Sequence, residues 1–285
     1  MPKKKFYNRR FLIWCGTIIC IILILSIFIV GMLIGKRTYA PDYKLKNISP
    51  HLFYPFGTDY LGRNVFFRTL KGLSESIAIG LFASLLSSVM SVAVGLFSAC
   101  GNKTVDRICL WVMDCFMGFP SMVLLMLVSY SLGGGVKGVV IGVAVTHWPD
   151  LARVIRAEVL SVKNTQYIQA SYCMGKNSLY VALHHIFPYI FPQFLTGLVL
   201  MFPHAIMHEA GITFLGFGLP LDSPAVGAIL SESMQQFITG QWWVVVFPGV
   251  SLFTVVLLFT GIGSGIRMLT GNMHVLEENI WVTKY

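Results

Sequence analysis

Long apolar runs separated by short polar segments dominate the chain and predict membrane-spanning helices. The first run is uncharged from 11 to 35, which at about 1.5 Å per residue is long enough to cross a bilayer. Its length and the lack of a small-residue cleavage site favour a retained helix over a secretory signal. Further runs predict spans near 76–100, 109–131, 136–149, 189–214 and 243–266. The pattern therefore predicts an all-α integral membrane protein with about six transmembrane helices.

These spans divide the chain into four parts. The predicted parts are a cytoplasmic stub with the first helix at 1–35, an extracytoplasmic or interfacial segment at 36–75, a five-helix core at 76–266 that includes a cytoplasmic loop at 150–188, and a cytoplasmic tail at 267–285. Glycine pairs spaced by four lie within the spans and permit close helix crossings: Gly31/Gly35, Gly138/Gly142 and Gly261/Gly265.

Composition supports the membrane assignment and weakens other classes. Hydrophobic residues make up 55% of the 285 residues and charged residues 12%, with a mean hydropathy of +0.73. A chain this apolar cannot hide its hydrophobic surface in one soluble core. The net charge of +9 is therefore interpreted as a signal of membrane topology, and no nucleic-acid partner is expected.

The distribution of Lys and Arg predicts that both termini are cytoplasmic and that the protein is a multi-pass component of the cytoplasmic (inner) membrane. Basic residues cluster before the first span, and the loop at 150–188 contains more of them, whereas 215–242 contains none. The segment 36–75 is an exception, because seven Lys or Arg residues lie on its expected outer side. Part of it is interpreted as an interfacial helix whose basic side chains reach the membrane surface.

Enzymatic and cofactor signatures are missing from the sequence. The six cysteines form no CxxC pair, and neither Gly-Lys dipeptide completes a phosphate-binding loop, because Val30 and Ala170 stand where its first glycine is required. His208-Glu209 begins the zinc-protease pattern, but Ile212 occupies the position of its second histidine. We therefore expect a non-catalytic chain that binds no cofactor and has no firmly assigned metal site.

The loop at 150–188 carries the sharpest local pattern. Its apolar residues around 168–172 recur at helical spacing, Gly175 predicts the end of that helix, and Pro188 precedes the next span. A short helix held between two spans can dock into a groove of a partner protein. An ordinary helical connection is the alternative that this pattern alone leaves open.

Three segments, taken together, resemble one family. The loop is similar to the EAA loop of ABC-importer permeases, and an upstream segment resembles the "HPFGTDxLGRDVFSR" segment of C-type subunits in the peptide/nickel permease family. The third match is Ile212-Thr213-Phe214-Leu215-Gly216-Phe217-Gly218, similar to "LSFLGLG". The residues that stand at the positions of the first two family segments are Gln169, Ala170, Ser171, Tyr172, Gly175 and Pro188 in the loop, and Gly57, Thr58, Asp59, Gly62 and Arg63 upstream.

The chain also departs from the family pattern. Gln169 replaces the usual glutamate of the loop, Ser171 the second alanine, Phe187 the leucine before the proline, and Asn64 the aspartate of the "GRD" triplet. The glutamine keeps a hydrogen-bonding side chain but lacks a charge, so a salt bridge to an ATPase at that position is not expected.

The resemblance implies the fold and partners of a type I ABC-importer transmembrane subunit with a cytoplasmic coupling helix. A B-type permease would complete a heterodimeric pore, two ATPase subunits using ATP and Mg²⁺ would dock on the loop, and an extracytoplasmic binding protein would deliver the substrate. ATP-driven movement of the loop would then expose the cavity alternately to each side of the membrane.

The substrate is the most open question. His204, His208 and Glu209, together with Asp114 in another span, are candidates to line the passage, because ionisable groups within a membrane are often functional. The histidines favour nickel, another transition metal or a metal chelate as the cargo, with di- or oligopeptides as the alternative. Helix–helix hydrogen bonding is the competing role for these side chains. A secondary transporter driven by an ion gradient is a further alternative, although no internal repeat is found.

Overall fold

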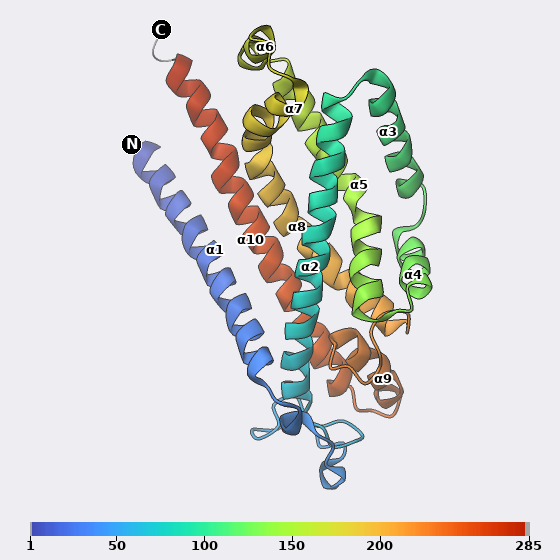
Figure 1. Ribbon diagram of the computed structural model, residues 1–285. Coiled ribbons are helices and arrows are strands. Elements are labelled where there is room, and N and C mark those ends of the chain that lie inside the picture. Colours follow the sequence, from blue (N-terminus) through green and yellow to red (C-terminus); the bar gives the residue numbers. More distant parts are fainter. Residues whose placement is uncertain (1, 283–285) are drawn as a thin grey trace.

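The computed structural model describes the backbone of residues 2–282 and the side chains of residues 11–269. Within that part of the chain the ordered structure is almost entirely helical (Figure 1). Its helices are α1 (Pro2–Leu33), the 3-10 helices η1 (Lys36–Tyr39) and η2 (Tyr43–Leu45), α2 (Val65–Cys100), α3 (Lys103–Met117), α4 (Ser121–Ser131), α5 (Gly135–Lys163), α6 (Gln166–Cys173), α7 (Ser178–Val181), the π-helical turn η3 (Ala182–Ile186), α8 (Phe187–Phe214), α9 (Val226–Ile238) and α10 (Trp243–Val282).

The number of candidate spans agrees with the prediction of about six. Five helical segments are long and apolar enough to cross a membrane, and α3 with α4, a pair bent by 92°, makes a sixth when the two are counted as one span. Gly118, Phe119 and Pro120 separate these two helices, because proline disfavours helical backbone in the residue before it. The prediction of an all-α membrane protein is therefore confirmed.

Several boundaries differ from those expected. The second span begins at Val65 rather than near 76, so the last part of the segment expected at 36–75 forms the first three turns of α2. The span expected at 136–149 continues as α5 to Lys163, well into the expected loop. The expected tail from 267 is likewise helical to Val282, as the continuation of α10. The basic side chains before residue 11 lie outside the described side chains.

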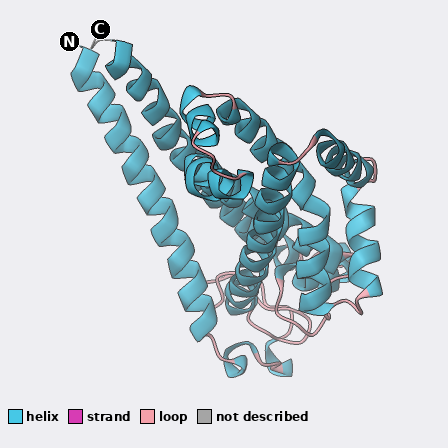
Figure 2. Cartoon of the chain, turned by 45° about the horizontal axis from the view of Figure 1, so that its top comes forward, coloured by secondary structure: helices cyan, strands magenta, loops and turns pink. Residues whose placement is uncertain are grey.

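The connections gather at two ends of the bundle. In Figure 1, α6, α7 and both termini lie at one end, whereas α9 and the segment that joins α1 to α2 lie at the other. We call these the α6 end and the α9 end. The loops therefore alternate between the ends as the sequence predicts. Figure 2 shows α1 and α10 running side by side to neighbouring termini, in agreement with their contacts along the bundle.

Small residues allow the spans to approach closely. A Cβ atom on Gly138 would lie 2.8 Å from the Ser129 carbonyl oxygen, and one on Gly265 would lie 2.0 Å from Thr17 Oγ1. A Cβ on Gly31 would lie 2.4 Å from the Leu70 carbonyl oxygen. Each glycine belongs to one of the expected pairs, whereas Gly35, the partner of Gly31, has no atom within 4 Å of such a Cβ. Close packing of this kind replaces the hydrophobic effect as the force that holds helices together in lipid.

Candidate functional site

Helix α6 is a short helix with one buried side and one exposed side, at the α6 end of the bundle. Ile168 is fully buried and packs with Val159 of α5 and Ile186 of η3, and Ser171 is also buried. The exposed side chains are Gln166, Tyr167, Gln169, Ala170 and Cys173. The helix is therefore anchored to the spans through Ile168 and leaves its other side open for a partner.

Gly175 ends α6 in a way that requires a glycine-like backbone. Its φ is +78°, and its N–H donates to the Tyr172 carbonyl oxygen at 2.9 Å, while the N–H of Lys176 donates to the Ser171 carbonyl oxygen at 3.3 Å. This pair of hydrogen bonds is the Schellman motif, in which the residue after the helix C-cap adopts left-handed backbone. The expected helix stop at Gly175 is present.

Gln169 turns back toward the preceding span. Its Nε2 donates to the carbonyl oxygen of Lys163, the last residue of α5, at 3.2 Å. A glutamate at this position would have no hydrogen to donate and would place a negative charge at the negative end of a helix dipole. The glutamine that departs from the family pattern therefore fits its local surroundings.

Polar contacts join the spans next to α6. Arg156 of α5 donates two hydrogen bonds of 2.6 Å to the carboxylate of Asp106 in α3, and Ser98 of α2 donates to the same carboxylate at 2.5 Å. Lys163 Nζ also donates to the Ala99 carbonyl oxygen at 2.8 Å. These contacts connect α2, α3 and α5 at one end, so a displacement of α6 would be passed to three spans. Pro188 lies in the first turn of α8, where a proline ring is tolerated.

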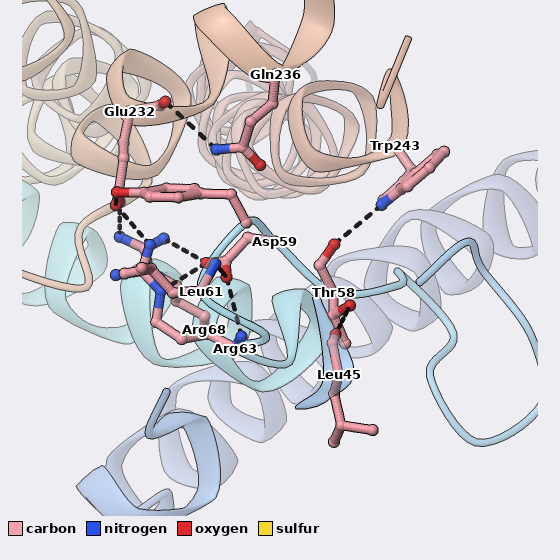
Figure 3. A network of polar contacts seen from close by, with 10 residues as sticks. Leu45, Thr58, Asp59, Leu61, Arg63, Arg68, Glu232, Gln236 and Trp243 are labelled. Atoms are coloured by element: carbon pink, nitrogen blue, oxygen red, sulfur yellow. Dashed lines mark hydrogen bonds and ion pairs between the residues drawn. The ribbon is translucent and has the colours of Figure 1, made fainter. Parts of the chain in front are cut away.

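At the α9 end, four charged side chains form a cluster that we call the clasp: Asp59, Arg63, Arg68 and Glu232 (Figure 3). Arg63 donates to Asp59 at 2.6 Å and to Glu232 at 2.5 Å. Arg68 pairs with Asp59 at 3.2 Å and also with Glu232. The clasp joins the segment before α2 and α2 itself to α9, which is distant from both in the sequence.

The electrostatics of the clasp favour charged groups. Burial alone would raise the pKa of Glu232, but the charge of Arg68 and hydrogen bonds from Tyr60, Arg68 and Arg63 outweigh it, so the pKa lies below its ordinary value. The hydrogen bond that Tyr60 donates to Glu232 at 2.7 Å raises the pKa of the Tyr60 phenol. The carboxylate of Glu232 is therefore held ionised between its two arginines.

The upstream family motif builds the turn that presents Asp59. Gly57 and Gly62 have φ values of +68° and +76°, and a Cβ on Gly62 would lie 1.8 Å from the Asp42 carbonyl oxygen. Asp59 Oδ1 accepts from the backbone N–H groups of Leu61 and Arg63 at 2.9 Å each. Thr58 Oγ1 donates to the Leu45 carbonyl oxygen at 2.5 Å. The structure thus brings all five motif residues together in one turn, with a structural role.

Asn64 caps the N-terminus of α2, since its Oδ1 accepts from the backbone N–H of Phe66 at 3.0 Å and of Phe67 at 3.5 Å. Aspartate and asparagine are about equally good N-caps. We expect Asn64→Asp to leave the free energy of unfolding in detergent nearly unchanged, and Asn64→Ala to lower it by about 1 kcal/mol. Equal losses for both variants in chemical denaturation would show that the cap has no part in the stability of α2.

The four candidates for the passage lining lie in different surroundings. His204 is exposed on α8, and His208 is partly buried, with its ring centroid 4.5 Å from that of His147. Glu209 is fully buried, and Thr213 Oγ1 donates to it at 3.1 Å, so in this conformation it packs within the subunit and touches no open space. Asp114 is exposed on α3 and pairs with Arg153 of α5, a basic partner that the sequence pattern did not reveal.

The histidines do not assemble a metal centre with their neighbours. Among the described side chains, no group of three or more His, Cys, Asp or Glu residues is placed to hold a metal ion. His204 instead lines a cavity between α2, α5, α8 and α10, together with His147. The cavity, rather than a metal site, is the feature with which the histidines are associated.

Comparison with solved structures supports the fold. The chain resembles a chain of the MetNI methionine ABC transporter, solved in inward-facing conformations, with a TM-score of 0.60 and 18% sequence identity. The likeness covers 72% of this chain and 97% of that one. The two chains therefore share a fold.

Sequence comparisons assign the family. The chain is 30% identical over 257 residues to the dipeptide transport system permease protein DppC of Alkalihalophilus pseudofirmus, covering 88% of this chain and 84% of that protein. It is 27% identical to DppC of Bacillus subtilis (strain 168), covering 78% of this chain and 69% of that protein. Residues 91–265 match the family described as the binding-protein-dependent transport system inner membrane component. The chain belongs to this family, the non-catalytic membrane permease subunits of ABC importers.

Proposed function

We propose that the chain forms half of the translocation pore of an ABC importer for di- or oligopeptides. The observation that carries this proposal is the 30% identity, over 88% of the chain, to a permease named for dipeptide transport. A second permease subunit would complete the pore, and an extracytoplasmic binding protein would deliver the peptide. Membership of an ATP-driven importer family also argues against a secondary transporter that uses an ion gradient.

Helix α6 is the proposed contact for the partner ATPase. Three of its features support this role: its exposed side, its anchorage through the buried Ile168, and the polar contacts that join α2, α3 and α5 beside it. Movement of a docked ATPase would displace α6 as a unit and tilt the connected spans. With α6 facing the ATPases, both termini would be cytoplasmic, because they lie at the same end of the bundle.

Peptide is proposed ahead of nickel or a metal chelate, although the histidines in the sequence favoured a metal. The named relatives transport peptides, and the described side chains offer no metal-binding group of three or more ligands. His204 and His208 are therefore assigned to the surroundings of the cavity, not to coordination of a cargo ion.

Uptake in cells that express the complete importer tests this proposal. Radiolabelled dipeptide is expected to accumulate above the level of cells that lack this subunit, whereas radiolabelled nickel, with or without a chelator, is expected to stay at that level. Accumulation of nickel or its chelate without accumulation of dipeptide would overturn the peptide assignment and restore metal as the cargo.

A further inference from the structure

A cavity of about 520 Å³ opens between α2, α5, α8 and α10. This volume lies within the range of about 300–1,000 Å³ that is typical of sites for small molecules. The lining combines apolar side chains, among them Val143, Leu151 and Leu200, with neutral polar ones from α2 and α8, among them Ser84 and Thr196. The cavity can therefore hold both the apolar and the polar parts of a small solute.

One acidic and one basic side chain lie in this lining, Asp150 of α5 and Arg267 of α10. Asp150 lies halfway along a membrane span, and within the described part of the chain its carboxylate makes no hydrogen bond or ion pair. Charged groups in membrane spans are costly and commonly line substrate pathways. A carboxylate without a partner in such a place indicates a positively charged group in the solute.

Two further observations point to a polar occupant. Ser87 of α2 lines the cavity, is fully buried, and its hydroxyl oxygen has no hydrogen-bond partner. Such a group costs free energy unless a solute or water satisfies it. Pro149, which precedes Asp150, has no N–H, so it cannot donate to the Val145 carbonyl oxygen one turn earlier. The cavity therefore has an unpartnered hydroxyl on α2, and the regular helical hydrogen bonding of α5 is interrupted next to Asp150.

We propose that this cavity recognises both free ends of a short peptide, with Asp150 facing the ammonium group and Arg267 the carboxylate. The inference rests on the proposed function and adds to it the chemical class of the solute, a zwitterion with separated charges. Ser87 would donate to or accept from the peptide backbone, and the apolar lining would contact its side chains. A zwitterionic lipid headgroup has the same charges and is the alternative occupant that the experiment distinguishes.

The test uses the complete importer, with its ATPases and binding protein, in proteoliposomes. Uptake is measured for a free dipeptide, its N-acetylated form and its C-amidated form, each at a saturating concentration of loaded binding protein. For the wild type we expect each blocking group to slow uptake about tenfold, the lower end of the effect of a hydrogen bond to a charged group. Wild-type uptake that is equally fast for free and blocked peptides would overturn the inference.

Variants assign each end of the peptide to one side chain. Asp150→Asn is expected to slow uptake of the free peptide about tenfold, and in this variant acetylation should have no further effect whereas amidation should still slow uptake. Arg267→Gln is expected to slow uptake of the free peptide by a similar factor, and in this variant amidation should have no further effect whereas acetylation should still slow uptake. Asp150→Glu and Arg267→Lys keep the charges and should respond to both blocking groups as the wild type does. Equal responses of all variants to both groups would contradict the assignment and favour a lipid headgroup or no fixed occupant.

Two charge-removing variants outside the cavity serve as matched controls. Glu158→Gln lies on α5 two turns beyond Asp150, and Arg107→Gln lies on α3, and neither side chain lines the cavity. Both are expected to respond to the blocking groups as the wild type does. If the wild type imports no peptide at all, the proposed function fails; if it imports peptides without regard to their ends, only the cavity assignment fails.

Discussion

Replacing Arg68 by methionine is expected to destabilise the subunit more than any other single change at the α9 end. Arg68 is 3% exposed and pairs with Asp59, which is 1% exposed, and with Glu232. Methionine would leave these carboxylates with only Arg63 as a charged partner. Removing one member of a buried ion pair typically costs about 3–5 kcal/mol, because the remaining charge is not solvated. Thermal unfolding of the detergent-purified subunit should shift down by roughly 5 °C or more.

Lys71→Met is the matched control, on the same helix and one turn further on. Lys71 lies 3.9 Å from Glu75 in a partly exposed pair, and such pairs contribute about 0–1 kcal/mol. Its unfolding temperature should therefore stay close to that of the wild type. If the two variants unfold at the same temperature, the clasp does not hold α2 against α9 as described.

The second large effect is expected at the end of α6, where Gly175→Val should reduce peptide uptake about tenfold. Left-handed backbone costs an ordinary residue roughly 1–2 kcal/mol, and a β-branched residue tolerates it poorly. A Cβ at this position would meet no atom within 4 Å, so the effect is one of backbone conformation and not of a clash. The last turn of α6 would unwind, and the exposed Ala170 and Cys173 would change their positions.

Gly175→Asn is the matched control, because asparagine enters left-handed backbone more readily than other residues with a side chain. Its uptake should remain close to that of the wild type, with equal amounts of each variant in the membrane. Uptake that is the same for valine and asparagine would show that the Schellman motif at Gly175 has no part in transport.

The spans could be predicted because few structures other than a membrane-spanning helix accommodate a long apolar run. The predicted start of α2 was wrong, because charged residues interrupt the apolar pattern there. Arg68, Lys71 and Glu75 lie in its first three turns and resemble a segment outside the membrane. The structure buries Arg68 in the clasp, and Lys71 and Glu75 pair with each other. A hydropathy pattern includes these charges but contains no information on their partners, so it places them outside the membrane.

The motif at 57–63 could likewise be recognised from sequence, but not the partners that give it a role. Glu232 pairs with Arg68 across 164 residues, and no motif marks Glu232. Asp114 and Arg153 are another pair that only the fold brings together. Glu209 is a case in which the fold changes the interpretation. An acid within a span suggested a residue that lines the passage, but in α8 its side chain is buried in the packed interior. In each case the partner of the side chain depends on the direction in which it leaves its helix and on how the helices pack, which sequence motifs do not give.

Crosslinking at Cys173 tests the central claim that α6 is the contact for the partner ATPase. Cys173 is exposed on α6, so a variant that keeps it as the sole cysteine of this chain can be joined by a short bis-maleimide to single cysteines introduced on the ATPase surface. Lys103→Cys, in a variant without other cysteines, is the control at the neighbouring turn that begins α3. We expect a crosslinked product of this chain and the ATPase from Cys173, and little from position 103. A product from position 103 but none from Cys173, in a complex that still imports peptide, would contradict it.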